Sequence, residues 1–304
     1  GNVYSATVTT GTWTLDISSV DATALNAAET ITADVSDVAG NPATQATRGI
    51  IHDVTAPTIS INAVSTDDII NAVEDDSPVT ISGTTDAEDG QVVTVNLNGN
   101  VYSATVTTGT WTLDISSVDA TALNTAETIT ADVSDLAGNP ATQATRGIVH
   151  DVTAPTLTVN PVSGDDQINA IEDDSPVTVS GTTDAEDGQV VTVELNGQVY
   201  SATVTAGAWT LDIPSLDAQA LDATEAMTVT VSDLAGNPST PYTTTIIHDT
   251  TAPTLTIDAV STDDIINAVE DDSPVTISGT TDAEDGQVVT VNLNGNVYSA
   301  TVTT

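Results

Sequence analysis

Apolar and polar positions alternate over short stretches of this chain. Trp209, Leu211 and Ile213 alternate with polar residues, and Val177 and Val179 do the same. A period of two is typical of a half-buried β-strand, so Trp209 should point into a core. Within residues 154–251 this pattern predicts strands over residues 156–162, 177–181, 191–195, 199–204, 209–213, 227–231 and 242–247, and a helical turn or ordered loop within 215–225.

Turn residues separate the predicted strands. The Asn196-Gly197 pair lies between two alternating stretches, and Asn-Gly is the strongest short hairpin signal. Clusters of Gly, Pro, Asn and Asp separate the other stretches. Seven short strands in a segment of this length predict an all-β fold, a β-sandwich of immunoglobulin type. The chain has no Cys, so the sandwich would lack the disulfide of antibody domains.

The pattern repeats with a period of 98 residues, as Trp13, Trp111 and Trp209 show. A period of this size matches one whole small domain, and the chain should therefore consist of tandem sandwiches arranged end to end. Counted from the Thr-Ala-Pro motif, residues 56–153 and 154–251 are complete repeats. Residues 1–55 are the C-terminal half of a repeat and residues 252–304 the N-terminal half. Residues 1–10 are identical to residues 295–304. The two halves could together make one more repeat, and the sequence leaves open whether they do so between molecules.

Charge narrows the choice of partners. The chain has 44 acidic residues against two basic ones, Arg48 and Arg146, and a formal net charge of -42. This excludes binding to nucleic acid or anionic lipid through a basic surface. Such a charge could indicate disorder, but the alternating Val and Ile positions favour folded β-structure. No apolar run reaches the roughly 20 residues of a membrane span. The carboxylates repel one another, so a cation should neutralise them.

A six-residue joint links the repeats. His150-Asp151-Val152-Thr153-Ala154-Pro155 recurs at residues 52–57 and, with Thr250 in place of Val, at 248–253. Its Pro keeps the chain extended. Strand order predicts which acidic loops share an end of a sandwich. We call the end where the chain enters the leading end and the end where it leaves the trailing end.

The junction between residues 56–153 and 154–251 should therefore gather three acidic groups. The trailing-end loop supplies Asp67, Asp68, Glu74, Asp75 and Asp76, with Asp119 as a further candidate, the joint supplies Asp151, and the leading end of the next repeat supplies Asp184, Glu186, Asp187 and Asp233. Ca²⁺ fits this set best, because it takes six to eight oxygen ligands in flexible geometry. Asn71 could add a side-chain oxygen.

The candidate calcium ligands lie in four groups that recur along the chain. They are Asp53, Asp151 and Asp249 of the joints; the paired Asp67, Asp68, Asp165, Asp166, Asp263 and Asp264; the turn residues Asp86, Glu88, Asp89, Asp184, Glu186, Asp187, Asp282, Glu284 and Asp285; and Asp135 and Asp233. The alternative is that these are solvated acidic loops without a metal.

Each joint also carries a His, at positions 52, 150 and 248. These histidines are expected to pack at the domain boundary; a pH-sensitive switch is the alternative. We expect no enzyme activity. A glycosidase-like carboxylate pair is not excluded by counting residues, but the acidic residues fall at the ends of the repeats and a small sandwich offers no obvious cleft.

Several motifs together resemble one known group of proteins. They include Asp-Val-Thr-Ala-Pro-Thr at residues 151–156, Ser-Gly-Thr-Thr at 180–183, Gly-Gln-Val-Val-Thr-Val at 188–193 and Ser-Asp-Leu-Ala-Gly-Asn-Pro at 232–238. This pattern resembles the bacterial immunoglobulin-like extender repeats of giant adhesins that are secreted by the type I route, among them the repeats-in-toxin and biofilm-associated adhesins of Gram-negative bacteria.

The resemblance implies a function. It implies a stalk that is stiffened by calcium at its linkers and that holds a ligand-binding region away from the cell, in a protein secreted to the surface of a Gram-negative bacterium. The implied linker ligands are Asp53, Asp151 and Asp249, with the Asp-Asp pairs and Asp37, Asp135 and Asp233 as further candidates. The near absence of Lys and Arg departs from the average member and suggests a saline or calcium-rich habitat.

The sequence therefore favours a monomeric, non-enzymatic stalk whose partners are calcium ions and its own neighbouring repeats. The rival hypothesis is a module that itself binds carbohydrate or associates with like repeats, as cadherin domains do. That rival requires an exposed aromatic platform. Aromatic residues make up 3% of the chain, and most fall at inward positions of the predicted strands.

Overall fold

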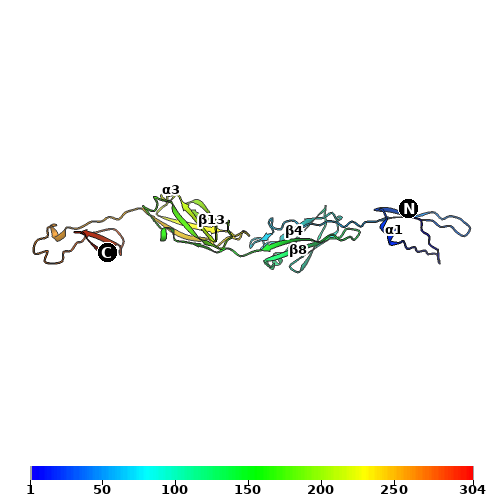
Figure 1. The fold of residues 1–304 in the computed structure, drawn as a ribbon, viewed down its shortest axis with the longest axis horizontal. Coiled ribbons are helices and arrows are strands. Elements are labelled where there is room, and N and C mark those ends of the chain that lie inside the picture. The colour runs from blue at the N-terminus through cyan, green and yellow to red at the C-terminus, as the bar shows by residue number, and fades with distance from the viewer. Residues whose placement is uncertain (1, 304) are drawn as a thin grey trace. The chain divides into compact units, whose positions relative to one another are not determined.

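The computed structural model describes residues 2–303. The chain divides into two units, Gly1–Thr153 with Ala235–Asn237, and Ala154–Leu234 with Pro238–Thr304. Each unit contains one β-sandwich with its own buried core and one smaller β-ribbon. Figure 1 follows the chain through both units by colour.

The sandwich of the first unit has two sheets. One has five strands in the order β3-β9-β8-β5-β6, and the other pairs β4 with β7. Figure 1 labels β4 and β8, one from each sheet. The elements are β3 (Ile69–Ile70), β4 (Val79–Thr84), β5 (Val92–Leu97), β6 (Asn100–Thr105), β7 (Thr110–Ile115), α2 (Ser117–Thr121), β8 (Ala126–Asp132) and β9 (Ala144–His150). Trp111 lies in the core and is 2% exposed.

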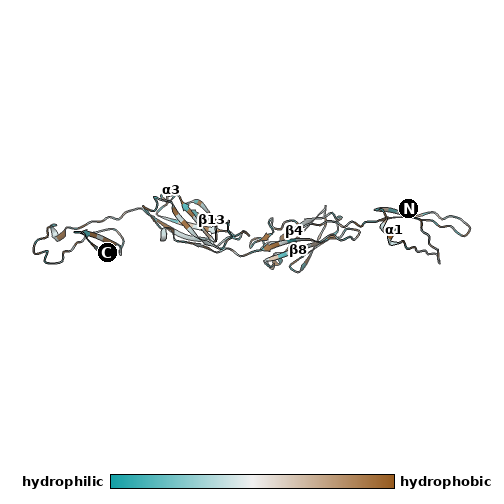
Figure 2. Ribbon diagram, in the orientation of Figure 1, coloured by the Kyte–Doolittle hydropathy of each residue, from teal (hydrophilic) through white to brown (hydrophobic). Residues whose placement is uncertain are grey.

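The sandwich of the second unit repeats this plan. Its sheets have the orders β11-β17-β16-β13-β14 and β10-β12-β15. The elements are β10 (Leu157–Val159), η1 (Val162–Gly164), β11 (Gln167–Asn169), β12 (Val177–Thr183), β13 (Val190–Leu195), β14 (Gln198–Thr203), β15 (Ala208–Ile213), α3 (Ser215–Ala218), β16 (Thr224–Val231) and β17 (Tyr242–Asp249). Brown bands along the strands of both sandwiches mark their apolar positions in Figure 2.

Two features differ from the predicted strands. The first strand was expected over residues 156–162, but β10 covers only Leu157–Val159, and the chain then turns at Ser163 and Gly164, which have φ of 52° and 98°. The predicted acidic loop contains β11, which pairs parallel with β17. The hairpin prediction is confirmed: Asn196 and Gly197 both have positive φ and connect β13 to β14.

The predicted all-β class with immunoglobulin-like sandwiches is confirmed. The three α-helices within residues 2–303 have five, five and four residues. Among the described residues, no helix is long and apolar enough to span a bilayer.

The two remaining segments contain short ribbons. Residues 1–55 hold α1 (Ser19–Thr23), β1 (Ala28–Ala33) and β2 (Ala46–Ile51), and residues 252–304 hold η2 (Val260–Thr262), β18 (Val288–Leu293) and β19 (Asn296–Thr301). Their apolar side chains are exposed where the sandwiches bury the equivalent residues. Trp13 is 55% exposed and Leu293 54%, whereas Trp111 and Leu97 are each 2% exposed.

Candidate calcium-binding joints

Each joint is held in the same local turn. The Asp151 carboxylate accepts a hydrogen bond from the Thr153 backbone N–H at 3.0 Å. Asp53 and Asp249 accept the equivalent hydrogen bonds from the N–H groups of Thr55 and Thr251, at 3.0 and 2.9 Å. An Asp that binds its own backbone two residues on forms an Asx turn. The joint aspartates are therefore structural elements of the linker as well as candidate ligands.

The turn that contains Asp135 contacts the joint that leads into the first sandwich. Asn139 donates from its side-chain amide to the Asp53 carbonyl oxygen at 3.2 Å and to the Asp135 carboxylate at 2.8 Å. Its backbone N–H also donates to Asp135, at 2.7 Å. The Asn139 side chain holds the pKa of Asp135 below its usual value. Asp135 is thus a stabilised anion beside the joint at Asp53.

The acidic turn at residues 86–89 lies at the same leading end. Glu88 accepts from the Leu136 N–H at 2.9 Å, and Asp86 accepts from the Thr58 N–H at 2.5 Å. The Thr58 backbone N–H lowers the pKa of Asp86. One hydrogen-bonded network therefore connects the joint carbonyl, the Asp135 turn and Glu88, and Asp86 binds the segment that follows the joint.

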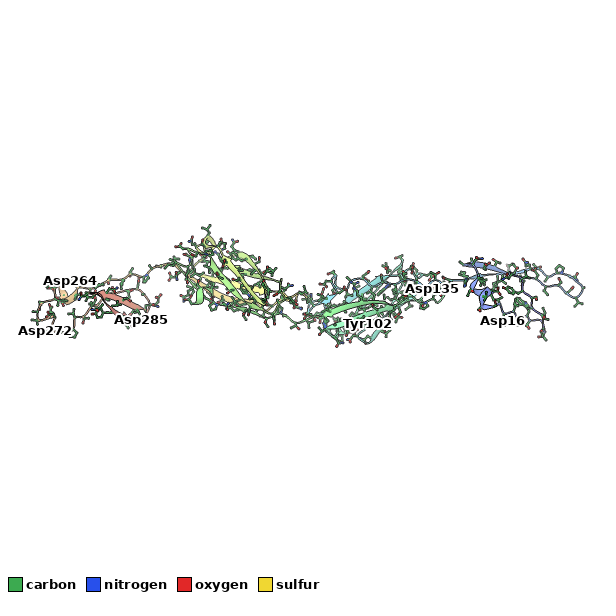
Figure 3. All side chains as sticks on the ribbon, viewed as in Figure 1. Asp16, Tyr102, Asp135, Asp264, Asp272 and Asp285 are labelled. Atoms are coloured by element: carbon green, nitrogen blue, oxygen red, sulfur yellow. The ribbon has the colours of Figure 1, made fainter. Side chains whose placement is uncertain are left out.

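The second unit shows the equivalent contacts. Thr156 donates to Asp184 at 2.6 Å, Leu234 donates to Glu186 at 2.8 Å, and Gly207 donates to Asp187 at 3.4 Å. Asp233 is buried. In residues 252–304, the Thr254 N–H binds Asp282 at 2.5 Å and lowers its pKa. Figure 3 shows Asp264, Asp272 and Asp285 at separate points of that segment.

The Asp-Asp pairs at the trailing ends are engaged by backbone N–H groups. The carboxylate of the first Asp in each pair accepts a hydrogen bond from the backbone N–H of the residue two positions later. These contacts are Ile69 to Asp67 at 3.0 Å, Gln167 to Asp165 at 3.1 Å and Ile265 to Asp263 at 3.1 Å. The carboxylate of the second Asp accepts a hydrogen bond from the backbone N–H of the residue four positions earlier. These contacts are Val64 to Asp68 at 3.0 Å, Val162 to Asp166 at 2.8 Å and Val260 to Asp264 at 2.9 Å. These contacts form the tight turn that leads into the short strands β3 and β11.

Asp68 has a second partner that the sequence did not suggest. Arg146 binds it through Nε at 2.6 Å and Nη2 at 2.5 Å, and donates from Nη1 to the Ile61 carbonyl at 3.1 Å. Arg146 holds the pKa of Asp68 below its usual value. Since a bidentate Arg occupies this carboxylate, Asp68 is a weaker candidate for calcium than Asp166, whose repeat has Thr244 at the equivalent position.

Asn71, a candidate ligand, makes contacts within the first unit. Its side-chain amide donates to the Ala235 carbonyl at 3.0 Å, and the Ala72 N–H donates to the Asn237 side chain at 2.9 Å. Asn237 in turn donates to the Asp151 carbonyl at 2.9 Å. The turn Ala235–Asn237 thus connects the loop at Asn71 with the joint at Asp151. Asn139 and Asn237 were not among the predicted site residues, although each recurs four residues after an Asp, at Asp135 and Asp233.

Each histidine lies directly before a joint aspartate and contacts a backbone carbonyl of its own repeat; that the histidines pack at a domain boundary stays a prediction. His150 lies in its own sandwich and is 9% exposed. Its Nδ1 faces the Leu123 carbonyl at 3.0 Å and its Nε2 faces Asp75 at 3.0 Å. His248 makes the same contacts with Leu221 and Asp173. Asp75 and Asp173 are therefore buried partners of the histidines.

The donor set suits calcium in its chemistry. Carboxylates, backbone carbonyls and Asn side chains are the oxygen ligands that Ca²⁺ takes, and all three occur at the joints. Within residues 2–303, no three His, Asp or Glu side chains lie close enough together to hold a metal ion. Carbonyl and amide oxygens would therefore have to complete any site at a joint.

Bacterial adhesins of solved structure are similar to this chain in sequence. No protein-family model and no curated protein matches the chain. Among solved structures, a Ca²⁺-stabilised adhesin that helps an Antarctic bacterium reach out and bind ice is 37% identical, over 95% of this chain and 74% of that one, with a TM-score of 0.44. A 1.5-MDa bacterial ice-binding adhesin studied for its retention at the host cell surface is 33% identical, over 81% and 83%, with a TM-score of 0.42.

A single domain gives a further match. The bacterial immunoglobulin-like domain of the M. primoryensis ice-binding adhesin is 38% identical over 33% of this chain and all of that domain, with a TM-score of 0.27. The sandwiches and their joints define a protein of tandem immunoglobulin-like repeats. From the sequence identity over these spans, the chain belongs to the family of immunoglobulin-like repeats of large bacterial adhesins, and the predicted resemblance is confirmed. These neighbours are adhesins and not enzymes.

Proposed function

We propose that the chain is an extender region, a stalk, of a large adhesin on the surface of a Gram-negative bacterium. It projects a distal ligand-binding region for adhesion and biofilm formation. Residues 56–153 and 154–251 are its complete repeats, and residues 1–55 and 252–304 are halves of further repeats. The family and the buried cores of both sandwiches support this proposal.

Calcium at the joints would make this stalk rigid. The observation that carries the proposal is the network at the leading end of the first sandwich, where Asn139 binds both the Asp53 carbonyl and Asp135 while Glu88 binds the same turn. Ligands from Asp53, Asp86, Glu88 and Asp135 would have to include backbone carbonyl oxygens, because no three of the described acidic side chains lie close enough together to hold a metal ion. The equivalent groups would serve the other joints. A bound cation supplies positive charge and so offsets the repulsion between these carboxylates.

Calcium concentration would then control stiffness. Extracellular calcium modules typically bind at about 10⁻⁴ to 10⁻³ M. The stalk would be limp in a calcium-poor cytoplasm and rigid after secretion. The charge of -42 favours this coupling, because without cations the acidic loops at each joint repel one another.

The rival role, direct recognition by each repeat, needs exposed aromatic side chains. In the two sandwiches Trp111 and Trp209 are 2% and 3% exposed. Both serve the core, which supports the stalk over a recognition module.

Small-angle X-ray scattering of the full chain tests the calcium-stiffened stalk. We expect the maximum dimension to increase with calcium and to fall with a chelator. A triple variant with Asp53, Asp151 and Asp249 changed to Asn should lose this response, because Asn keeps the Asx turn but removes the charge. The matched control changes Asp16, Asp114 and Asp212 to Asn, removes the same charge with the same spacing, and should respond as the wild type does. An unchanged dimension in the wild type, or equal responses of both variants, would refute the proposal.

A further inference from the structure

Two hairpin turns carry an Asn-Gly pair that the proposed function does not use. Asn98-Gly99 connects β5 to β6, and Asn196-Gly197 connects β13 to β14. At an Asn-Gly pair the backbone nitrogen of Gly can approach the Asn side chain closely, because Gly has no Cβ. The two turns have nearly the same backbone, with Asn φ of 48° and 49° and Gly φ of 75° and 69°. The backbone therefore gives neither Asn an advantage in a reaction with its Gly.

Both Asn side chains share one restraint. The Asn98 amide donates a hydrogen bond to the Ala122 carbonyl at 2.8 Å, and the Asn196 amide donates to the Ala220 carbonyl at 3.0 Å. These carbonyls lie just after the short helices α2 and α3. Each bond restrains the side chain that would have to turn toward the backbone nitrogen of the following Gly.

Asn98 has a second restraint. Asn124 donates from its side-chain amide to Asn98 Oδ1 at 3.2 Å and to Glu127 at 2.5 Å. The residue equivalent to Asn124, 98 positions later, is Asp222, and an ionised carboxylate has no proton to donate to the Asn196 oxygen. Asn98 is also half-buried, whereas Asn196 is exposed. The Asn196 side chain is therefore held at fewer points and is more open to water.

We propose that Asn196-Gly197 is a self-modification site, at which the chain deamidates more rapidly than at Asn98-Gly99. The Gly197 backbone nitrogen bonds to Asn196 Cγ, the Cγ–Nδ2 bond breaks, and the proton of the Gly nitrogen leaves with Nδ2 as ammonia. Water then opens the resulting succinimide ring at either of its carbonyl carbons. The products are Asp and isoaspartate. Water is the reagent consumed, ammonia is released, and no group is oxidised or reduced.

The modification changes the charge and the backbone of the second repeat. Each event replaces a neutral amide by a carboxylate, so it adds to the net charge of -42. In isoaspartate the main chain passes through the former side chain and gains a methylene group. The loop of a hairpin sets the register of its strands, so a longer loop should weaken the pairing of β13 with β14. The second repeat should therefore change before the first.

Slow incubation of the folded full chain at constant pH and temperature tests the proposal. Trypsin then cuts the chain only after its two Arg residues, so Asn98 and Asn196 fall into separate fragments, 49–146 and 147–304. A second protease and mass spectrometry measure the fraction converted at each turn, and Gln198 identifies the peptide that contains Asn196. We expect Asn196 to react roughly fivefold faster, the effect of about one net hydrogen bond on a rate.

Two single substitutions test the cause of the difference. Asp222→Asn supplies the missing donor and should slow the reaction of Asn196 to the rate of Asn98. Asn124→Asp removes the donor and should raise the rate of Asn98 to that of Asn196. In each variant the other repeat is unaltered and serves as the matched control, so its rate should not change. Rates that stay at their wild-type values in both variants would overturn the proposal.

The same measurement in a denaturant removes the effect of the fold. The two Asn-Gly pairs follow a Leu in both repeats, Leu97 and Leu195, and should then react at equal rates. A difference that persists in the denaturant, or equal rates in the folded chain, would contradict the role of the side-chain contacts. A faster reaction at Asn98 in the folded chain would do the same, because the bond from Asn124 would then activate the Asn98 carbonyl instead of restraining it.

Discussion

Replacing Gly83 with alanine should destabilise the first sandwich by about 3 kcal/mol or more, at the upper end of what overpacking costs. The added Cβ would lie 1.9 Å from the Ser60 carbonyl oxygen and 2.5 Å from the Trp111 ring. A backbone oxygen cannot move away as the end of a flexible side chain can. Trp111 is 2% exposed and has little room to shift.

Calorimetry of the full chain can measure this effect, with the unaltered second sandwich as an internal reference. A loss of this size should lower the melting temperature of the first sandwich by at least about 10 °C. Gly147→Ala is the matched control: it lies in the same sandwich, and an added Cβ there meets nothing within 4 Å. If the first sandwich has the same melting temperature in Gly83→Ala as in Gly147→Ala, the close packing of Trp111 on Gly83 is wrong.

Removing the Asp173 carboxylate should destabilise the second sandwich by about 3 kcal/mol, the usual cost of breaking a buried ion pair. The Leu221 carbonyl can only accept a hydrogen bond, so Nδ1 of His248 must donate to it at 2.9 Å. An ionised Asp173 also only accepts, at 3.0 Å from Nε2. His248 is therefore held as an imidazolium. Asp173→Ala should lower the urea midpoint clearly. The exposed neighbour substitution Asp174→Ala should change it little.

The same pair predicts a pH dependence. The Asp173 carboxylate raises the pKa of His248. A His with a raised folded pKa contributes stability that is fully present below the unfolded value of about 6.5 and is lost as the pH rises through the folded value. The stability difference between the wild type and Asp173→Asn should therefore shrink as the pH rises above the unfolded value of about 6.5. A constant difference in urea midpoints over this range would contradict the charged pair.

Local patterns in the sequence predicted most of the fold, because each predicted strand or turn depends on residues that are neighbours in the sequence. Alternation placed Trp209 in the core, and Asn196-Gly197 predicted the β13–β14 hairpin. Strand β11 was missed because it has three residues and pairs with residues of β17 that lie 80 positions further along the chain. No local period encodes a contact between segments that far apart.

The candidate site was predictable in its location but not in its contacts. Strand order places Asp86, Glu88 and Asp135 at one end of the first sandwich, and hydrogen bonds connect them there to the joint and its neighbours. The partners of these acids are mostly backbone N–H groups and Asn side chains, which composition does not reveal. The Arg146–Asp68 pair spans 78 residues, and only the folded chain brings it together.

The parallel pairing of β11 with β17 determines how a sandwich would carry tension. β11 follows soon after the incoming joint, and β17 ends at Asp249 in the outgoing one. Their registered pairs are Gln167 with Ile247, Ile168 with His248 and Asn169 with Asp249. A force on the two chain ends pulls these parallel strands in opposite directions along their axes, so the bonds between them are loaded in shear and must break together. In a stalk of the kind proposed above, this short strand would act as a mechanical clamp.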